Sequence, residues 1–260
     1  MFSRISWIAL LCVALTALAG AAEPESAPAA PSLAERLETA VRSSDDARIE
    51  KVHQDVLAAA EREANQYEWR ILAAKGYLAR ADLLRVQRQM GKVSEEENSA
   101  MREQQAIWGK AGAEHAEAAK RLATTDQEKS EAYRLSGECT VHRINGPFAG
   151  MRYGPTAKSD IEYALEKNPE NWEAHRAQGL MFLNNPPING GDLDKALETF
   201  SECAENDGDR DAYHALLAQT WMKKDRPERA RLEVQKALAG NPDNLLARLT
   251  KERLEERKAW

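Results

Sequence analysis

Cysteine and histidine are scarce in this sequence, which limits the chemistry it can perform. Three cysteines occur in 260 residues, and one of them, Cys12, lies in an apolar N-terminal stretch. So few cysteines do not make a disulfide scaffold, and we predict that Cys139 and Cys203 are free, buried and structural. The five histidines are scattered singly, without the spacing of metal ligands. The sequence therefore predicts no metal site.

Two further kinds of catalytic signature are missing. No glycine-rich loop is present to cradle a phosphate, and the carboxylates are too numerous and too exposed to mark an acid–base pair. Gly190 and Gly191 precede an expected helix, where we predict that they form the turn and that Asp192 caps the helix. We therefore expect no enzymatic activity and no cofactor.

An excess of positive charge is also absent. The chain has 36 basic and 42 acidic residues, giving a net charge of −6. This balance argues against a general nucleic-acid binder, because phosphate contacts need a clustered basic face. Ala, Glu, Arg, Lys and Leu dominate the composition and favour helices.

The one long apolar run lies at the N-terminus, between Ile5 and Gly20. Small residues follow it, and we predict a signal peptide over residues 1–21 that is cleaved near Ala21. The run has about 16 residues, whereas a membrane span needs about 20, so we expect no stable span after cleavage. Retention as an uncleaved anchor is the alternative. Residues 22–31 are rich in Pro and Ala and are predicted to form a disordered linker.

The clearest structural pattern is a pair of amphipathic helices in the 34 residues from Asp211 to Asn244. Pro227 suits the first turn of the second helix, where a missing N–H costs nothing. Ala230, Val234 and Ala237 then recur at steps of four and three, so they share one face of that helix.

This order of small and aliphatic residues resembles the tetratricopeptide repeat (TPR), which has a 34-residue helix–turn–helix period. The resemblance implies an all-α, right-handed superhelical solenoid of antiparallel helix pairs, with about 4–5 repeats and a C-terminal capping helix. Small residues such as Gly137, Gly179 and Ala196 are expected where paired helices approach. The predicted TPR-like domain spans 32–258, with repeats at 33–66, 67–125 (irregular), 130–169, 170–208 and 211–244, and a capping helix at 243–258.

Two insertions interrupt this pattern, at 145–155 and at 184–191. Their glycines and prolines predict loops, and equivalent insertions in successive repeats of a solenoid emerge on the same edge. We therefore expect them to lie side by side as a ridge. Two interpretations of its apolar residues are open, namely that they fold down to seal a gap between helices or that they form a docking surface. These residues are Phe148, Met151, Tyr153 and Ile188.

The stretch 151–165 (MRYGPTAKSDIEYAL) together with 185–200 (NPPINGGDLDKALETF) resembles an exported bacterial repeat subtype. It is similar to the TPR component of TRAP-type transporters and, more distantly, to the eukaryotic regulators of microtubule dynamics. The first similarity implies export to the bacterial periplasm and contact with a solute-binding protein.

The TPR resemblance also implies that the first helix of each repeat lines a concave groove. Arg134 and Arg176 occupy equivalent positions in adjacent repeats and could clamp a carboxylate of a partner. Alternatively, they pair with Glu131, Glu138 or Glu173 of the chain itself. The candidate groove residues are Arg70, Tyr77, Arg80, Arg134, His142, Arg176 and Asn184.

We therefore expect a non-catalytic exported scaffold that binds a protein or peptide of unknown identity through the groove, the ridge or both. The alternative is a periplasmic transport accessory that handles a small ligand with a solute-binding protein, as a homo-oligomer. An open polar groove would favour the scaffold, and a deep apolar channel around the inserted loops would favour the accessory. A passive envelope spacer is a third interpretation.

Overall fold

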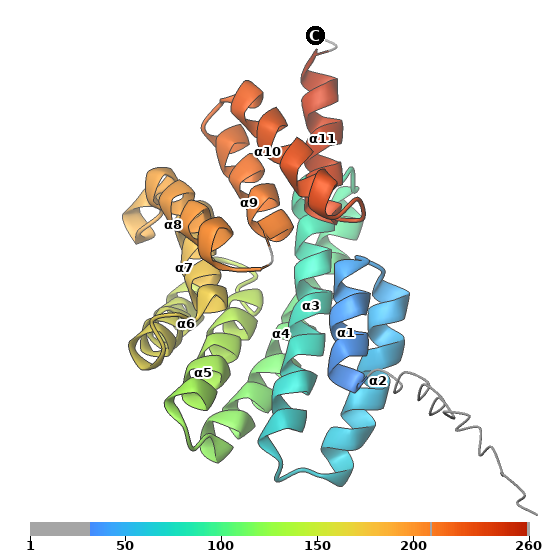
Figure 1. The fold of residues 1–260 in the computed structure, drawn as a ribbon, viewed down its shortest axis with the longest axis vertical. Coiled ribbons are helices and arrows are strands. Elements are labelled where there is room, and N and C mark those ends of the chain that lie inside the picture. The colour runs from blue at the N-terminus through green and yellow to red at the C-terminus, as the bar shows by residue number, and fades with distance from the viewer. Residues whose placement is uncertain (1–31, 209, 259–260) are drawn as a thin grey trace, which may run out of the picture. The chain divides into compact units, whose positions relative to one another are not determined.

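The described part of the chain, residues 32–208 and 210–258 of a computed structural model, consists of helices joined by short connections and contains no strand (Figure 1). This confirms the predicted all-α solenoid of antiparallel helix pairs. The signal peptide and linker predicted for residues 1–31 lie outside the described residues. The helices are α1 (Leu33–Arg42), α2 (Asp46–Arg62), α3 (Tyr67–Met90), α4 (Glu95–Leu122), α5 (Asp126–His142), α6 (Pro147–Lys167), α7 (Trp172–Asn184), α8 (Leu193–Asn206), α9 (Arg210–Lys223), α10 (Pro227–Gly240) and α11 (Leu245–Lys258).

None of the helices in the described ranges is both long and apolar enough to cross a membrane.

Side-chain caps define where several helices begin. A capping box of Ser32 and Glu35 starts α1, and Thr125 with Glu128 forms the same motif at α5. Asp192 accepts from the backbone N–H groups of the first turn of α8, as predicted. These caps satisfy N–H groups that have no partner inside their helices.

Small residues allow the paired helices to approach closely. A Cβ on Gly137 would lie 2.8 Å from Ile161 Cγ1, and a Cβ on Gly179 would lie 2.5 Å from Phe200 Cε1. Ala196 on α8 is completely buried. The small residues thus lie where paired helices approach, as predicted, because a larger side chain at these positions would force neighbouring atoms apart. We call this contact between the two helices of a pair the helix seam.

The first insertion, 145–155, was expected to be a loop, and this prediction is wrong for most of its length. Residues 147–155 belong to α6, which begins at Pro147 and contains Pro155. Pro147 occupies the first turn, where a proline is well tolerated, and Pro155 and Met151 are exposed, so the unpaired Met151 carbonyl can face solvent. The second insertion, by contrast, is a connection with a single short 3₁₀ turn (Pro187–Asn189).

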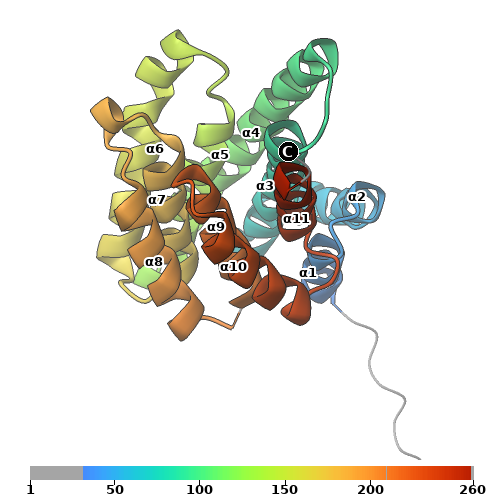
Figure 2. The ribbon, with the colours of Figure 1, turned by 90° about the horizontal axis from the view of Figure 1, so that it is seen from above.

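The solenoid closes on itself, which the sequence did not predict. Asn241 Nδ2 donates to the Arg42 carbonyl (3.1 Å), and the Leu245 N–H donates to Ser44 Oγ (3.4 Å). Arg253 of α11 donates to the Met90 carbonyl at the end of α3 (2.9 Å). Figure 2 shows α11 over α3 and close to α1. The concave side therefore forms a central chamber that remains open to solvent.

Candidate functional site

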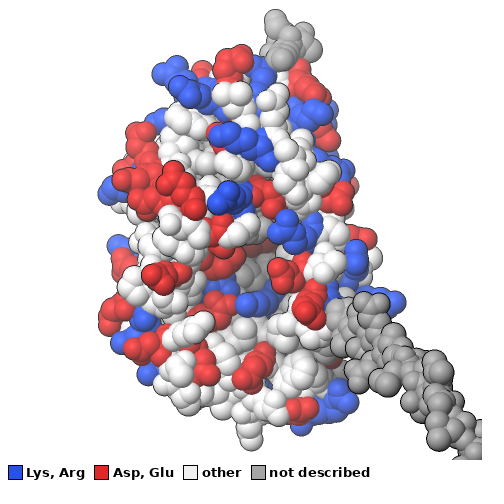
Figure 3. Space-filling view, in the orientation of Figure 1, with Lys and Arg blue, Asp and Glu red and all other residues white. Residues whose placement is uncertain are grey.

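The chamber at the centre of the helical unit has a volume of about 790 Å³. Figure 3 shows a hollow near the middle of this face, with basic and acidic side chains around it. Its walls come mainly from α1, α3, α9 and α11, while α5 and α7 contribute charged residues. Among the described lining residues, five are basic and five are acidic, so the chamber does not select strongly for either sign of charge.

Apolar side chains cover much of the chamber wall. Leu37 and Val41 come from α1, Leu72 comes from α3, and Leu216 and Leu245 come from α9 and α11. Val41 is 40% exposed, whereas Leu37 belongs to the buried core beneath it. The wall can therefore offer apolar contact to a ligand while its base contributes to the fold.

The predicted arginine pair lies in the base of the chamber, and both guanidinium groups are bound by glutamates of this chain. Arg134 Nε donates to Glu131 Oε2 (2.8 Å), and Arg134 also pairs with Glu138. Arg176 Nη2 lies 2.7 Å from Glu138 Oε1 and 3.0 Å from Glu173 Oε2. We call Arg134, Arg176 and the three glutamates the buried charge cluster. Its geometry matches the alternative in which the arginines pair within the chain.

The electrostatics of this cluster follow from burial combined with close opposite charges. The Arg134 side chain is 3% exposed. Burial opposes its charge, yet Glu131 and Glu138 hold the Arg134 pKa above its usual range. Burial likewise raises the pKa of Glu131, but Arg134 and Lys75 outweigh it and hold that pKa well below its usual range. The cluster is a set of mutually satisfied ions, which binds helices α5 and α7 together.

His142 and Asn184 are also engaged by other helices. Gln105 Nε2 of α4 contacts His142 Nδ1 (2.8 Å), and His142 Nε2 lies 3.3 Å from Asp82 Oδ1 of α3. Lys223 of α9 donates to Asn184 Oδ1 (3.1 Å). Both residues therefore connect neighbouring helices.

The predicted groove residues of α3 contact neighbouring helices and do not line the central chamber. Tyr77 packs between His53 of α2 and His115 of α4, with ring centres 4.4 and 5.9 Å away. The guanidinium of Arg80 lies 4.1 Å from the centre of the Trp108 ring and 3.0 Å from Asp46. Arg70 donates to His115 and to the Ala64 carbonyl instead of lining the chamber.

The face of α3 that lines the chamber is rotated from the predicted one because His53 packs against Gly76. A Cβ on Gly76 would lie only 2.2 Å from the His53 ring, so this side of α3 must face α2. The chamber instead receives Lys75, Ala79 and Asp82. Their spacing of four and three residues is visible in the sequence, but the orientation of α3 is set by its contact with α2.

The residues predicted for the ridge do not seal a gap, because three of them point into solvent. Phe148 is 84% exposed, Met151 69% and Ile188 93%. Tyr153 is half-buried beneath Arg143, whose guanidinium lies 4.1 Å from the ring centre. That the two inserted segments lie side by side stays a prediction.

A second cavity, of about 410 Å³, lies beside the start of α6. We call it the basic pocket, because three basic side chains and no acidic one occur among the described residues that line it. The residues come from α4, the α5–α6 connection and the first turns of α6, and they are Ala106, Lys110, Arg143, Asn145, Phe148, Ala149, Arg152 and Tyr153.

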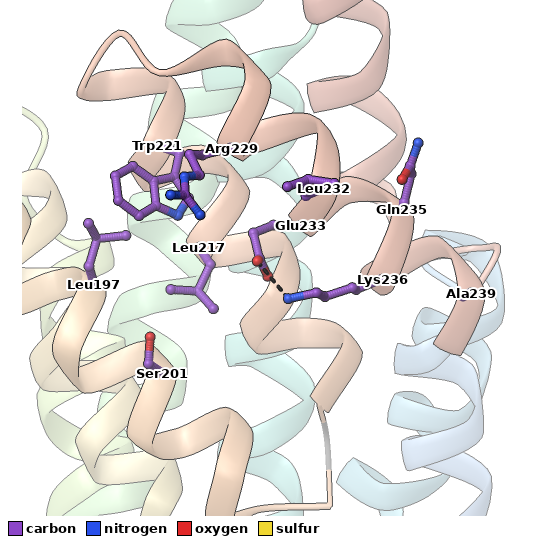
Figure 4. Close-up of a pocket in the computed structure, with 10 residues that line it drawn as sticks. All are labelled: Leu197, Ser201, Leu217, Trp221, Arg229, Leu232, Glu233, Gln235, Lys236 and Ala239. Atoms are coloured by element: carbon purple, nitrogen blue, oxygen red, sulfur yellow. Dashed lines mark hydrogen bonds and ion pairs between the residues drawn. The ribbon is translucent and has the colours of Figure 1, made fainter.

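A third depression, of about 570 Å³, separates α8 from α10 over the side of α9 (Figure 4). Leu197, Leu217 and Leu232 supply apolar surface beside the Trp221 ring. Glu233 binds Lys236 at 2.8 Å on its rim. Its position between the second helices of two successive pairs is that of an ordinary gap between stacked repeats.

The two described cysteines are buried, as predicted, and form no disulfide with each other. Burial raises the pKa of both thiols, that of Cys203 to about 12. Both are therefore protonated at neutral pH and unsuited to nucleophilic chemistry. Within residues 32–208 and 210–258, no group of three or more His, Cys, Asp or Glu side chains is placed to hold a metal ion.

No protein-family model matches the chain, and no curated protein matches its sequence. Its structure is similar to the crystal structure of TTC0263, a thermophilic TPR protein of Thermus thermophilus, with a TM-score of 0.58 and 16% sequence identity over 86% of this chain and 98% of that one. It also aligns with YrrB, described as a TPR protein with an unusual peptide-binding site, with a TM-score of 0.43 and 17% identity over 85% of this chain and 98% of that one. The first likeness supports a TPR-like fold.

Proposed function

We propose that this protein is a non-catalytic exported scaffold that binds a segment of a partner protein in the central chamber. The observation that supports the proposal is the chamber itself, which brings apolar side chains from α1, α3, α9 and α11 around one volume of about 790 Å³, with Val41 exposed and Leu72 and Leu245 half-buried. Aligned first helices of successive repeats create such concave surfaces in solenoid proteins.

The chemistry of the chamber favours an amphipathic segment. The guanidinium groups of the buried charge cluster are already bound to glutamates, so they add little new affinity for an acidic ligand. Apolar contact with Val41, Leu72 and their neighbours would supply most of the affinity. Glu38, which is exposed at the chamber, would contact polar groups of the same segment.

The test is to fill the chamber with a larger side chain. Ala79 and Ala212 line it and are half-buried, so Ala79→Trp and Ala212→Trp should occupy the space that the ligand needs. Ala100→Trp, at an exposed position of α4, is the matched control. Peptides selected from a random library against the full chain would be titrated by calorimetry.

We expect both chamber variants to weaken the selected peptides by roughly tenfold or more, and the control to leave their affinity unchanged. Equal affinity for all three variants, with unchanged melting temperatures, would reject the chamber as the binding site.

A small ligand is the second candidate, because the volume of the chamber falls in the range of about 300–1,000 Å³ that is typical of small-molecule pockets. In this case the protein would be the transport accessory that works with a solute-binding protein. Mass spectrometry of the native protein purified without denaturation would reveal a retained small molecule, and Ala212→Trp should release it. Persistent absence of a ligand and of ligand-induced stabilisation would reject this candidate.

Export is the part of the proposal that depends on residues 1–21. The N-terminal sequence supports it through an apolar run followed by small residues. Sequencing the N-terminus of the full-length product expressed in a bacterium tests it. We expect a mature protein that begins at Ala22, whereas a product that keeps Met1 would contradict cleavage.

A further inference from the structure

The basic pocket beside the start of α6 concentrates positive charge, and among the described acidic residues only the exposed Glu114 pairs with one of its cations. Lys110 of α4, Arg143 after α5 and Arg152 of α6 line it, and no acidic residue does so among the described ones. The whole chain has a net charge of −6. A local cluster of cations is therefore a departure from the general character of the protein.

The two arginines of the pocket share one aromatic ring. The guanidinium of Arg143 lies 4.1 Å from the centre of the Tyr153 ring, and that of Arg152 lies 5.2 Å from it. Neither guanidinium group forms an ion pair or hydrogen bond with the described residues. The ring offsets part of the cost of holding two like charges together, and an anion would relieve the rest.

The surroundings of the pocket combine this charge with apolar surface. Phe148 belongs to the lining and is 84% exposed, and Met151 on the next turn is 69% exposed. Lys110 has one acidic neighbour, Glu114, at 3.9 Å, and both side chains are about two-thirds exposed, so this pair is weak. Exposed aromatic and arginine side chains together are typical of interaction surfaces.

We propose that the basic pocket binds an acidic segment of a partner protein. Carboxylates of that segment would pair with Arg143 and Arg152, whose orientation is restricted by the ring, and an apolar side chain would cover Phe148. An acidic peptide segment suits the site, because the cations and the exposed Phe148 ring border one shallow depression of about 410 Å³. The site shares no lining residue with the central chamber and does not depend on it.

The experiment is a titration of the full chain with a fluorescent peptide in which pairs of glutamates alternate with single leucines. The same peptide with every glutamate replaced by glutamine reports the contribution of charge. The test variant is Arg143→Gln with Arg152→Gln. Lys51→Gln with Lys158→Gln is the control, because both lysines are exposed, lie outside the pocket and change the net charge equally.

We expect the acidic peptide to bind the wild-type protein and the lysine control equally, and the arginine variant to bind it roughly tenfold or more weakly. Phe148→Ala should also weaken it, and the glutamine peptide should not bind detectably. No binding of the acidic peptide, or equal weakening by the lysine control, would overturn the proposal. Binding of vesicles that contain anionic lipid, with no binding of the peptide, would likewise overturn it in favour of a membrane surface.

Discussion

Two pairs of arginines lie in contrasting surroundings in this molecule. Arg134 and Arg176 line the chamber with glutamates bound to both guanidinium groups. Arg143 and Arg152, by contrast, line the basic pocket, both near the Tyr153 ring and with no acidic partner among the described residues. In the first pair the Arg134 side chain is 3% exposed and that of Arg176 is 16% exposed, whereas Arg143 is half-buried and Arg152 is exposed.

The comparison separates a structural arginine from one that is available to a ligand. A buried guanidinium needs its carboxylates to offset the loss of hydration, so Arg134 and Arg176 are committed to the fold. An exposed guanidinium loses little hydration and can exchange water for a carboxylate of a partner. Four variants, ordered from the largest expected effect to the smallest, test this distinction.

Removing the shared carboxylate of the buried charge cluster should have the largest effect. Glu138→Gln deprives both Arg134 and Arg176 of a buried partner, so we expect the free energy of unfolding in urea to fall by about 3 kcal/mol. Glu114→Gln, which alters an exposed pair with Lys110, is the control and should change it by less than about 0.5 kcal/mol. Equal effects of the two substitutions would show that burial does not distinguish these charges.

A substitution at the helix seam shows how much the free energy of unfolding falls when the interior is disturbed without a change of charge. Ala196 is fully buried in α8, and Ala196→Leu should overpack the contact and cost about 1–3 kcal/mol. A melting curve identical to that of the wild type would contradict the packing of α7 against α8.

His53 is a buried base without a carboxylate partner, and it extends the comparison to pH. Burial lowers its pKa from 6.5 to about 4, and its Nε2–H donates to the Ala73 carbonyl. Because the folded pKa is below the unfolded one, the unfolded state binds more protons as the pH falls below 6.5, and stability decreases between pH 6.5 and 4.

Between pH 7 and pH 5.5 this loss should amount to about 1 kcal/mol, in a range where ordinary carboxylates remain ionised. His53→Gln should remove the contribution of His53 and leave that of His115, whose pKa burial also lowers. His175→Gln, which leaves both residues in place, should retain the full loss. Urea titrations at the two pH values measure both. Unchanged pH dependence in His53→Gln would refute the assignment.

An exposed aromatic of the basic pocket should matter least to the fold. Phe148→Ser removes a side chain that is 84% exposed, so we expect the free energy of unfolding to change by less than about 0.5 kcal/mol. A loss of several kcal/mol in a urea titration would mean that Phe148 seals the core after all.

Much of the local structure was predictable, because it depends on neighbouring residues. Such local features include the capping box of Ser32 and Glu35, the cap at Asp192 and the small residues of the helix seam. Each acts within one helix pair, and the seam residues recur with the repeat period. Even the pairing of Arg134 with Glu131 and Glu138 follows from helical spacing.

The remaining features depend on contacts between distant segments. The closure of Asn241 on Arg42 and the orientation of α3 by His53 have no local signal in the sequence. The start of α6 is not evident from the sequence, because Pro147 and Pro155 are typical of loops. In the structure the first suits a helix start and the second lies on an exposed face. The solvent exposure of the arginine side chains, which distinguishes the two pairs, also depends on the folded structure and not on the local sequence.

The central claim is that these two arginine pairs have different roles, and the unfolding free energies of two double variants test it most directly. Arg134→Gln with Arg176→Gln leaves Glu138 buried between two neutral amides, whereas Arg143→Gln with Arg152→Gln removes only cations that have no acidic partner among the described residues. In urea titrations of the full chain, we predict a loss of about 3 kcal/mol or more for the first variant and less than about 0.5 kcal/mol for the second. Similar losses in the two variants would contradict the account.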